Sequence, residues 1–204
     1  MNQFSQNLVI NQGGVYTVTA TNPTTGCTTS KTISVSESEL ALLDYDDITV
    51  YDLTGDGTNR IEIQTGVDNL GIGDYEFAFN DGSFQDSPVF DDVEPGIHKI
   101  SVKDKNGCGI AEIMVSVIGY KYFFTPNSDG INDTWQILGI SEQFQAESLI
   151  YIFDRHGRLL TQIATDGEGW DGTYNGSALP ADDYWFRVNL EDGRSFTGNF
   201  SLIR

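Results

Sequence analysis

Residues 14–35 read GVYTVTATNPTTGCTTSKTISV, and residues 96–117 read GIHKISVKDKNGCGIAEIMVSV. Both stretches contain a glycine, an alternating strand, a turn, a Gly-Cys pair and a second alternating strand, in the same order. The offset is 82 residues at the first glycine (14 to 96) and 81 at the cysteine (27 to 108). This period suits a small β-sandwich module. The sequence therefore predicts a tandem repeat of β modules.

Short bursts of alternating apolar and polar residues recur outside the repeat as well. Ile61 and Ile63 in RIEIQT, and Tyr75, Phe77 and Phe79 in DYEFAFND, place apolar side chains at every second position. Such alternation is typical of half-buried strands, whereas the spacing of amphipathic helices is almost absent. The expected fold class is all-β, with tandem sandwich modules built from antiparallel sheets.

The repeat divides the chain into three parts. Residues 1–38 look like the last hairpin of a truncated module, residues 39–118 like a complete module, and residues 119–204 follow a different pattern. A lone hairpin cannot bury its own apolar face. Met1 leads directly into strand-like sequence with no export signal in front of it. We therefore expect the natural protein to extend further upstream.

The charge balance limits the classes of partner. The 204 residues include 11 Lys and Arg against 30 Asp and Glu, which gives a formal net charge of −19. A chain this acidic repels phosphate backbones and anionic membrane surfaces, so we expect no nucleic-acid partner. No apolar run is long enough to cross a bilayer. The scattered acidic residues are interpreted as a solvated surface, with divalent cations as the alternative.

The two cysteines occupy equivalent positions of the repeat. A bond between Cys27 and Cys108 would require the same surface of two successive modules to meet. Residues 39–95 contain no cysteine that could pair within the module. We therefore expect Cys108 to be an unpaired and largely buried thiol, and two cysteines at this spacing do not make a zinc site.

Catalytic patterns are missing from the sequence. His98 and His156 fall in different parts of the chain, and no G-x-S-x-G motif or glycine-rich phosphate loop is present. The adjacent carboxylates of Asp182 and Asp183 would point to opposite faces of a strand, so they cannot flank one bond. We expect that the chain is not an enzyme.

Two loops carry oxygen side chains around glycine, as calcium loops do. The first has Asn127, Asp129, Asn132 and Asp133 as candidate metal ligands, and the second spans residues 52–59. Neither has the glutamate at the twelfth position of a complete EF-hand loop. Ordinary turn chemistry produces the same composition. Calcium is the one cofactor that the sequence suggests, and both interpretations stay open.

The C-terminal part contains two hairpin patterns. Residues 149–160 read LIYIFDRHGRLL, with a glycine-bearing turn between alternating strands. Residues 183–203 read DYWFRVNLEDGRSFTGNFSLI, where Asp192-Gly193 suits a tight primed turn. Between them, GWDGTYNG (residues 169–176) places Trp170 and Tyr174 among glycines, which is typical of an irregular loop fixed by aromatic burial.

In this order, the blocks from Tyr122 to Arg204 resemble the type B sorting domain of the type IX secretion system, also called the gliding-motility-associated C-terminal domain. The matching motif elements are Thr125-Pro126-Asn127, Asp129-Gly130, Asn132-Asp133, Trp135, Ile152-Phe153-Asp154-Arg155, Gly157-Arg158, Gly169-Trp170-Asp171-Gly172, Asn175-Gly176, Pro180, Tyr184-Trp185 and Gly198. Ser128 stands where this family usually has glycine. Upstream, FDDVEPGIHKISVKDKNGC (residues 90–108) is similar to the immunoglobulin-like or PKD-like modules of surface adhesins.

The resemblance implies a C-terminal sorting and export signal on a secreted or cell-surface adhesin. It implies recognition by the type IX translocon and by a PorP/SprF-like outer-membrane barrel protein, with delivery across the outer membrane. An exposed terminal hairpin has a free edge to which a partner strand can add. The candidate partner-binding residues are Tyr184, Trp185, Phe186, Phe196, Phe200, Ser201, Leu202, Ile203 and Arg204.

Three interpretations of the function stay open at this stage. The alternative to sorting is a calcium- or glycan-binding adhesin module with the C-terminal domain as a structural cap. A hydrolase accessory fragment would require aromatic side chains aligned on one sheet face. For the aromatic candidates of the hairpin, core packing competes with partner binding, because alternation forces one face of each strand inward.

Overall fold

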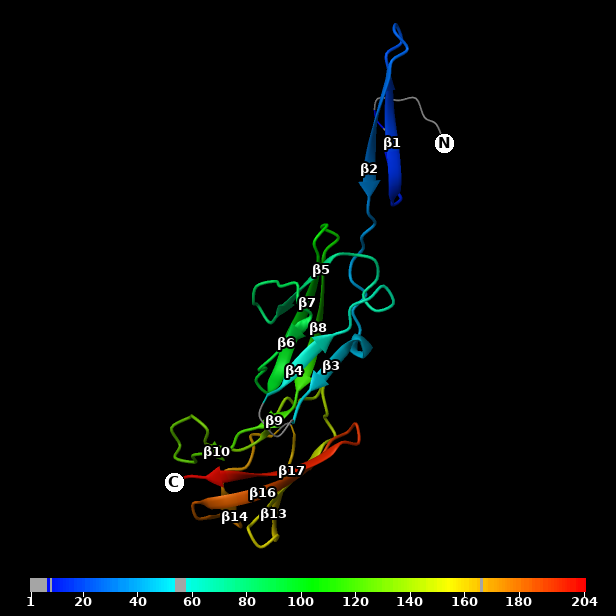
Figure 1. Cartoon of the computed structure of the whole chain (residues 1–204). Helices are drawn as coiled ribbons and strands as arrows, with labels where there is room; N and C mark the ends of the chain where they lie inside the picture. The colour runs from blue at the N-terminus through cyan, green and yellow to red at the C-terminus, as the bar shows by residue number, and fades with distance from the viewer. Residues whose placement is uncertain (1–6, 8, 54–57, 166) are drawn as a thin grey trace.

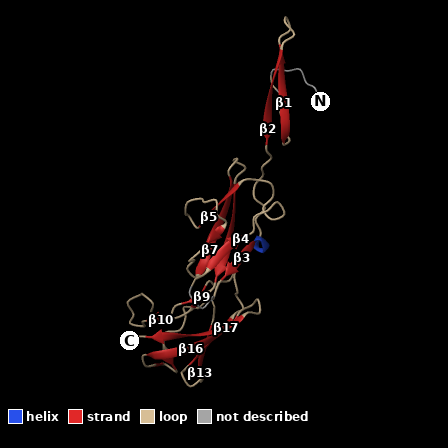
Figure 2. Cartoon of the chain, in the orientation of Figure 1, coloured by secondary structure: helices blue, strands red, loops and turns tan. Residues whose placement is uncertain are grey.

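The computed structural model describes residues 7, 9–53, 58–165 and 167–204. It arranges them as an elongated chain of β structure (Figure 1). Strands form almost all of its regular structure, and the helical element in the described ranges is one 3₁₀ turn, η1 at Tyr45–Asp47 (Figure 2). The all-β prediction is confirmed. No helix in these ranges has the length and apolar character needed to cross a membrane.

The first hairpin repeats the register of a later one. Strands β1 (Gly14–Thr21) and β2 (Thr28–Val35) pair Gly14 with Val35, and strands β7 (Gly96–Asp104) and β8 (Ile110–Val117) pair Gly96 with Val117. The two hairpins differ in burial: Val18 is 55% exposed, whereas its counterpart Ile100 is fully buried. The β1–β2 hairpin therefore exposes the face that the β7–β8 hairpin packs into a core.

The middle unit, residues 41–117, contains two three-stranded sheets around one core. The first sheet has the order β3-β4-β6 and the second β5-β7-β8. The further strands are β3 (Ile48–Tyr51), β4 (Arg60–Ile63), β5 (Tyr75–Phe79) and β6 (Val89–Phe90). Alternate residues of these strands, such as Ile61, Ile63 and Val102, are buried, which is the arrangement expected when each sheet has one inward face.

The C-terminal unit, residues 118–204, is built on a five-stranded sheet of order β10-β17-β16-β12-β13. Its strands are β10 (Phe123–Phe124), β12 (Leu149–Phe153), β13 (Leu159–Ile163), β16 (Asp182–Asn189) and β17 (Ser195–Leu202). Short pairs accompany it: β9 (Gly119–Tyr120) with β11 (Ile137–Leu138), and β14 (Thr173–Tyr174) with β15 (Ser177–Ala178). The strands of both predicted hairpins are present. The two-residue strand β10 departs from the antiparallel prediction, since it pairs with β17 in parallel.

Aromatic rings form the centre of the C-terminal core. Trp135 is fully buried and stacks on Phe200, with ring centroids 3.9 Å apart and an interplanar angle of 12°. Its indole N–H donates to the carbonyl oxygen of Lys121 at 2.8 Å, so the one polar group of this buried side chain has a partner. Trp170 is also buried and donates to the carbonyl oxygen of Thr173 at 2.9 Å. This contact provides the predicted aromatic anchoring of the glycine-rich loop.

The cysteine expectation needs a correction. Cys27 and Cys108 are both free, and both are exposed. Cys108 lies in the turn between β7 and β8, outside the core, where its thiol donates to the carbonyl oxygen of Ser38 at 3.3 Å. The expectation of a largely buried Cys108 was wrong, because the turn projects beyond the sheet that it connects.

Candidate partner-binding surface

The structure divides the predicted partner-binding residues between the core and the surface. The buried ones are Tyr184, Phe186, Phe200 and Leu202. They occupy even-numbered positions of β16 and β17, which face inward because side chains alternate along a strand. These four side chains belong to the core of the folded domain, whereas Trp185, Ile203 and Arg204 are exposed, and Phe196 and Ser201 are partly buried.

Trp185 belongs to an apolar row across the outer face of the sheet. It lies opposite Phe153 of β12 and opposite Asn199 of β17. Phe153 in turn lies opposite Leu159 of β13. Trp185 is 42% exposed and Leu159 is 48% exposed. Cross-strand neighbours on one face interact directly, so Leu159, Phe153 and Trp185 form one partly exposed apolar strip.

The end of the chain is held against the domain. The N–H of Ile203 donates to the carbonyl oxygen of Phe124 at 3.0 Å. The guanidinium of Arg204 donates to the carbonyl oxygens of Leu179 at 3.0 Å and Gly172 at 3.3 Å. Arg204 is exposed but already has partners within the domain, whereas the side chain of Ile203 is 48% exposed.

The candidate calcium loop is closed by its own backbone. Asp133 accepts hydrogen bonds from the N–H groups of Asn127, Ser128 and Gly130, at 2.6 to 3.0 Å. Asp129 accepts from the N–H of Ile131 at 2.7 Å and from the side-chain amide of Asn127 at 2.8 Å. The backbone hydrogen bonds to Asp133 hold its pKa below its ordinary value, and the bond from Gly130 has the largest effect.

These hydrogen bonds favour the turn interpretation over a metal site. Donors point at both oxygens of Asp133 and of Asp129, and the Asn132 side-chain oxygen accepts from Lys121 at 2.6 Å. No group of three or more His, Cys, Asp or Glu side chains that could hold a metal occurs in the part of the chain that the structure describes. The residues present do not fit a preformed calcium site. In the second candidate loop, residues 54–57 lie outside the described residues.

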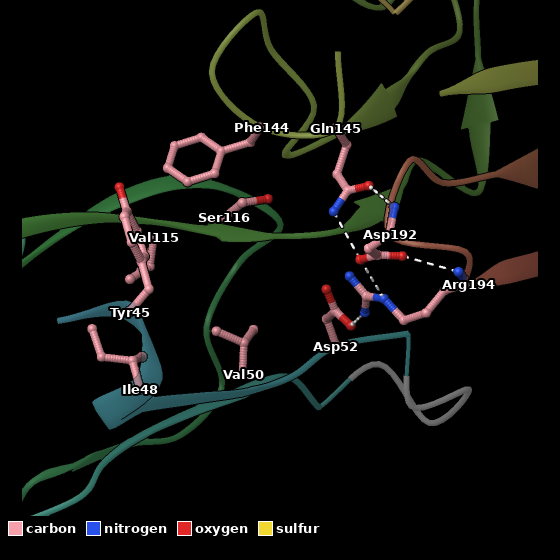
Figure 3. Close-up of a pocket in the computed structure, with 10 residues that line it drawn as sticks. All are labelled: Tyr45, Ile48, Val50, Asp52, Val115, Ser116, Phe144, Gln145, Asp192 and Arg194. Carbon is pink, nitrogen blue, oxygen red and sulfur yellow. Dashed lines mark hydrogen bonds and ion pairs between the residues drawn. The ribbon is translucent and has the colours of Figure 1, made fainter. Parts of the chain in front are cut away.

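A junction between the two units brings together residues whose proximity the sequence did not indicate. A cavity of about 390 Å³ lies there, lined by Tyr45, Ile48, Val50, Asp52, Val115, Ser116, Phe144, Gln145, Asp192 and Arg194 (Figure 3). Tyr45 meets Phe144 edge-on, with centroids 6.3 Å apart. Asp52 accepts from the N–H of Ile118 at 2.9 Å and from Arg194 at 2.8 Å. No local pattern signals these contacts, because their partners are far apart in sequence.

The electrostatics of the junction follow from these contacts. Burial lowers the pKa of Arg194, but the charge of Asp52 and the bonds to Asp192 outweigh it, so the pKa is raised. Partial burial raises the pKa of Asp192, but hydrogen bonds from Arg194 outweigh this effect and the pKa lies below its ordinary value. Arg194 and Asp192 therefore stabilise each other's charged forms.

A comparison with protein families identifies the C-terminal unit. Residues 118–202 match the family model described as the CHU_C type IX secretion signal domain. Residues 118–202 form a type IX secretion signal domain. The signal domain thus covers the whole five-stranded sheet together with its aromatic core. Such a signal implies interaction with the secretion system and export to the cell surface or the exterior.

The other comparisons add no functional argument. No curated protein matches the chain. Among solved structures it is similar to a biofilm-associated protein BSP domain (10% identity, TM-score 0.29, 76% of this chain and 29% of that one). It is also similar to dimeric latent PorU from Porphyromonas gingivalis (12% identity, TM-score 0.28, 97% and 24%) and to Tp47, the 47-kilodalton lipoprotein of Treponema pallidum (10% identity, TM-score 0.28, 87% and 54%). The chain spans about a quarter to about half of these structures.

Proposed function

We propose that this protein is part of an exported surface adhesin, and that its signal domain delivers the attached chain through the type IX translocon. The family match of residues 118–202 carries the proposal. Recognition by a PorP/SprF-like outer-membrane barrel protein belongs to the same proposal, as does the absence of enzymatic activity. The role follows from protein–protein recognition, for which a folded domain with an exposed apolar strip is suited.

Within this proposal the recognition surface includes Trp185 and Ile203. Both have large apolar side chains that are nearly half exposed, and tryptophan is among the residues that most often carry the binding energy of protein interfaces. Phe196 instead packs against the core from the inward face of the sheet, and Arg204 donates its guanidinium N–H groups to carbonyl oxygens of the domain. The buried aromatic residues of the hairpin support this surface from beneath.

The test uses the full chain fused behind a fluorescent protein that carries an inner-membrane export signal. The fusion is expressed in a bacterium with a type IX secretion system and in the same strain without its translocon. We expect protease-accessible fluorescence on the surface or in the medium for the first strain, and retention in the periplasm for the second. Equal external fluorescence in both strains would contradict the proposed function.

The recognition surface has its own comparison within that assay. Trp185→Asp places a charge in the exposed strip, and we expect it to lower the delivered fraction about tenfold. Arg187→Asp is the matched control, because Arg187 follows two residues later on the same outer face. If the two variants are delivered equally, Trp185 is not part of the recognition surface, and the proposed sorting role is unaffected.

A further inference from the structure

The sheet of the signal domain has one edge that is covered only at its end. Strand β17 pairs with β16 along its whole length, from Ser195 to Leu202. On its other side the pairing found among the described residues is with β10, through Phe123 opposite Ser201 and Phe124 opposite Leu202. The remaining residues of β17 therefore form a sheet edge.

The hydrogen bonds of the neighbouring residues fix the direction of the backbone along this edge. Ser201 donates its N–H to Tyr122 at 2.8 Å and Ile203 donates to Phe124 at 3.0 Å, both away from β16. At the other end of the strand, the carbonyl of Arg194 accepts from Leu190, toward β16. Backbone groups alternate in direction along a strand. Thr197 and Asn199 therefore direct their N–H and C=O groups to the open edge, where their N–H groups have no partner among the described residues.

An apolar groove runs beside this edge. It has a volume of about 620 Å³, and its lining includes Phe196 and Thr197 of β17 together with Leu53, Pro95, Tyr122 and Phe123. Tyr122 is 62% exposed and Phe123 is 48% exposed. The groove places large apolar side chains next to unpaired backbone donors, which is the combination that strand addition uses.

The edge lacks the features that usually protect one. Natural sheet edges are blocked by lysine, proline, a bulge or a covering segment. Strand β17 reads SFTGNFSL, with no lysine and no proline, and its pairing with β16 runs without a register shift. An uncovered edge of this kind, here residues 195–200, is an aggregation hazard unless a partner occupies it.

We propose that the open edge of β17 is the docking site for an extended segment of another protein, which adds to the sheet as a sixth strand. Main-chain hydrogen bonds to Thr197 and Asn199 hold the segment, and its large apolar side chains enter the groove at Tyr122 and Phe123. A second copy of this chain is disfavoured, since two molecules with a net charge of −19 each repel one another. The occupant is a neutral or basic strand, and the inference rests on the proposed sorting function.

The decisive comparison changes one backbone donor. Thr197→Pro removes the outward N–H while proline remains compatible with a sheet edge. Thr197→Val keeps the N–H and the β-branched shape, and serves as the matched control. In the delivery assay with the full chain, we expect Thr197→Pro to lower the exported fraction about tenfold or more, and Thr197→Val to stay within about twofold.

A second pair keeps the test independent of folding. Tyr122→Glu places a charge in the groove without changing the edge, and Tyr51→Glu makes the same change at an exposed tyrosine of β3. Thermal unfolding of each purified chain identifies any variant that fails to fold. We expect Tyr122→Glu to lower delivery and Tyr51→Glu to leave it unchanged.

The outcomes separate the two proposals. Failure of the wild-type chain to be delivered refutes the sorting function itself. If the wild type is delivered and a folded Thr197→Pro or Tyr122→Glu variant is delivered equally well, the edge inference alone is overturned. Sedimentation of the purified chain adds a third outcome: a wild-type dimer that Thr197→Pro dissociates overturns the inference in favour of a second copy.

Discussion

Arg194, in the turn between β16 and β17, donates from Nη1 to Oδ1 of Asp52, 2.8 Å away and 142 residues earlier in the chain. The Asp52 side chain is only 4% exposed, and its second oxygen accepts from the N–H of Ile118. Leu53, the next residue, packs against the core of the signal domain. One loop of the middle unit thus contacts both the terminal hairpin and the core beneath it.

Replacement of Arg194 tests this connection. Arg194→Met leaves a nearly buried carboxylate with one remaining donor, and we expect a loss of about 1–2 kcal/mol, reduced from the cost of a fully buried pair because Arg194 is half exposed. Denaturant unfolding measures the loss. Arg187→Met is the control and should stay within about 0.5 kcal/mol. A double-mutant cycle with Asp52→Asn that shows no coupling would contradict the pairing.

The tryptophans of the signal domain should divide by burial. Trp135→Ala removes a fully buried ring stacked on Phe200, and we expect a loss of about 3–5 kcal/mol. Trp185→Ala removes a half-exposed ring and should cost no more than about 1 kcal/mol. Urea unfolding followed by circular dichroism measures both. Similar losses for the two variants would contradict the exposed position of Trp185 on the outer face of the sheet.

Backbone strain at Ser128 gives a prediction of opposite sign. Its φ is +63°, a left-handed conformation that glycine adopts without steric cost. Ser128→Gly should therefore raise the stability by about 0.5–1 kcal/mol. Ser177→Gly, at an exposed position of β15, should lower it by a similar amount. A loss at Ser128 would mean that its hydroxyl matters more than its backbone.

The pKa of Asp133 predicts how acid affects this loop. Its folded pKa lies below the ordinary value of 3.8, so the stabilisation is fully present above the unfolded pKa and is lost as the pH falls through the folded pKa. The difference in unfolding free energy between wild type and Asp133→Asn should be constant from about pH 7 to 5 and shrink below about pH 4. Glu142→Gln removes one exposed charge as a control. A constant difference at all pH values would contradict the lowered pKa.

Chelation tests the calcium hypothesis for the same loop. Because both carboxylates already accept N–H donors, we expect the thermal midpoint to be the same in millimolar calcium and in excess chelator. A bound ion at a hundred times its dissociation constant would stabilise the fold by about 2.7 kcal/mol. A midpoint that rises with calcium in wild type, but not in Asp133→Asn, would establish the site instead.

Local patterns predicted much of the fold because strands leave local signals. The alternation of Tyr184 and Phe186 with Trp185 and Arg187 identified a strand. It also held information on burial, since Tyr184, Phe186 and Val188 are apolar whereas the odd positions include Arg187. For Tyr184 and Phe186 the structure shows the core packing that the sequence left open as the alternative to partner binding.

Long-range features had no comparable signal. Strand β10 has two residues, too few for a periodic pattern, and its parallel pairing depends on the position of β17. The contact of Asp52 with Arg194 joins two loops whose separation no spacing rule specifies. The open edge of β17 also has no local signal, because whether another strand covers it depends on the assembled sheet.

The parallel pair of β10 and β17 has a consequence for how the signal domain forms. It joins the beginning of the domain to its last strand, so the sheet cannot be completed until every strand between them is in place. Contacts between residues so distant in sequence make folding slow, on the order of milliseconds to seconds. The folded signal is thus expected to form slowly, because Phe124 and Leu202 pair across nearly the whole length of the domain.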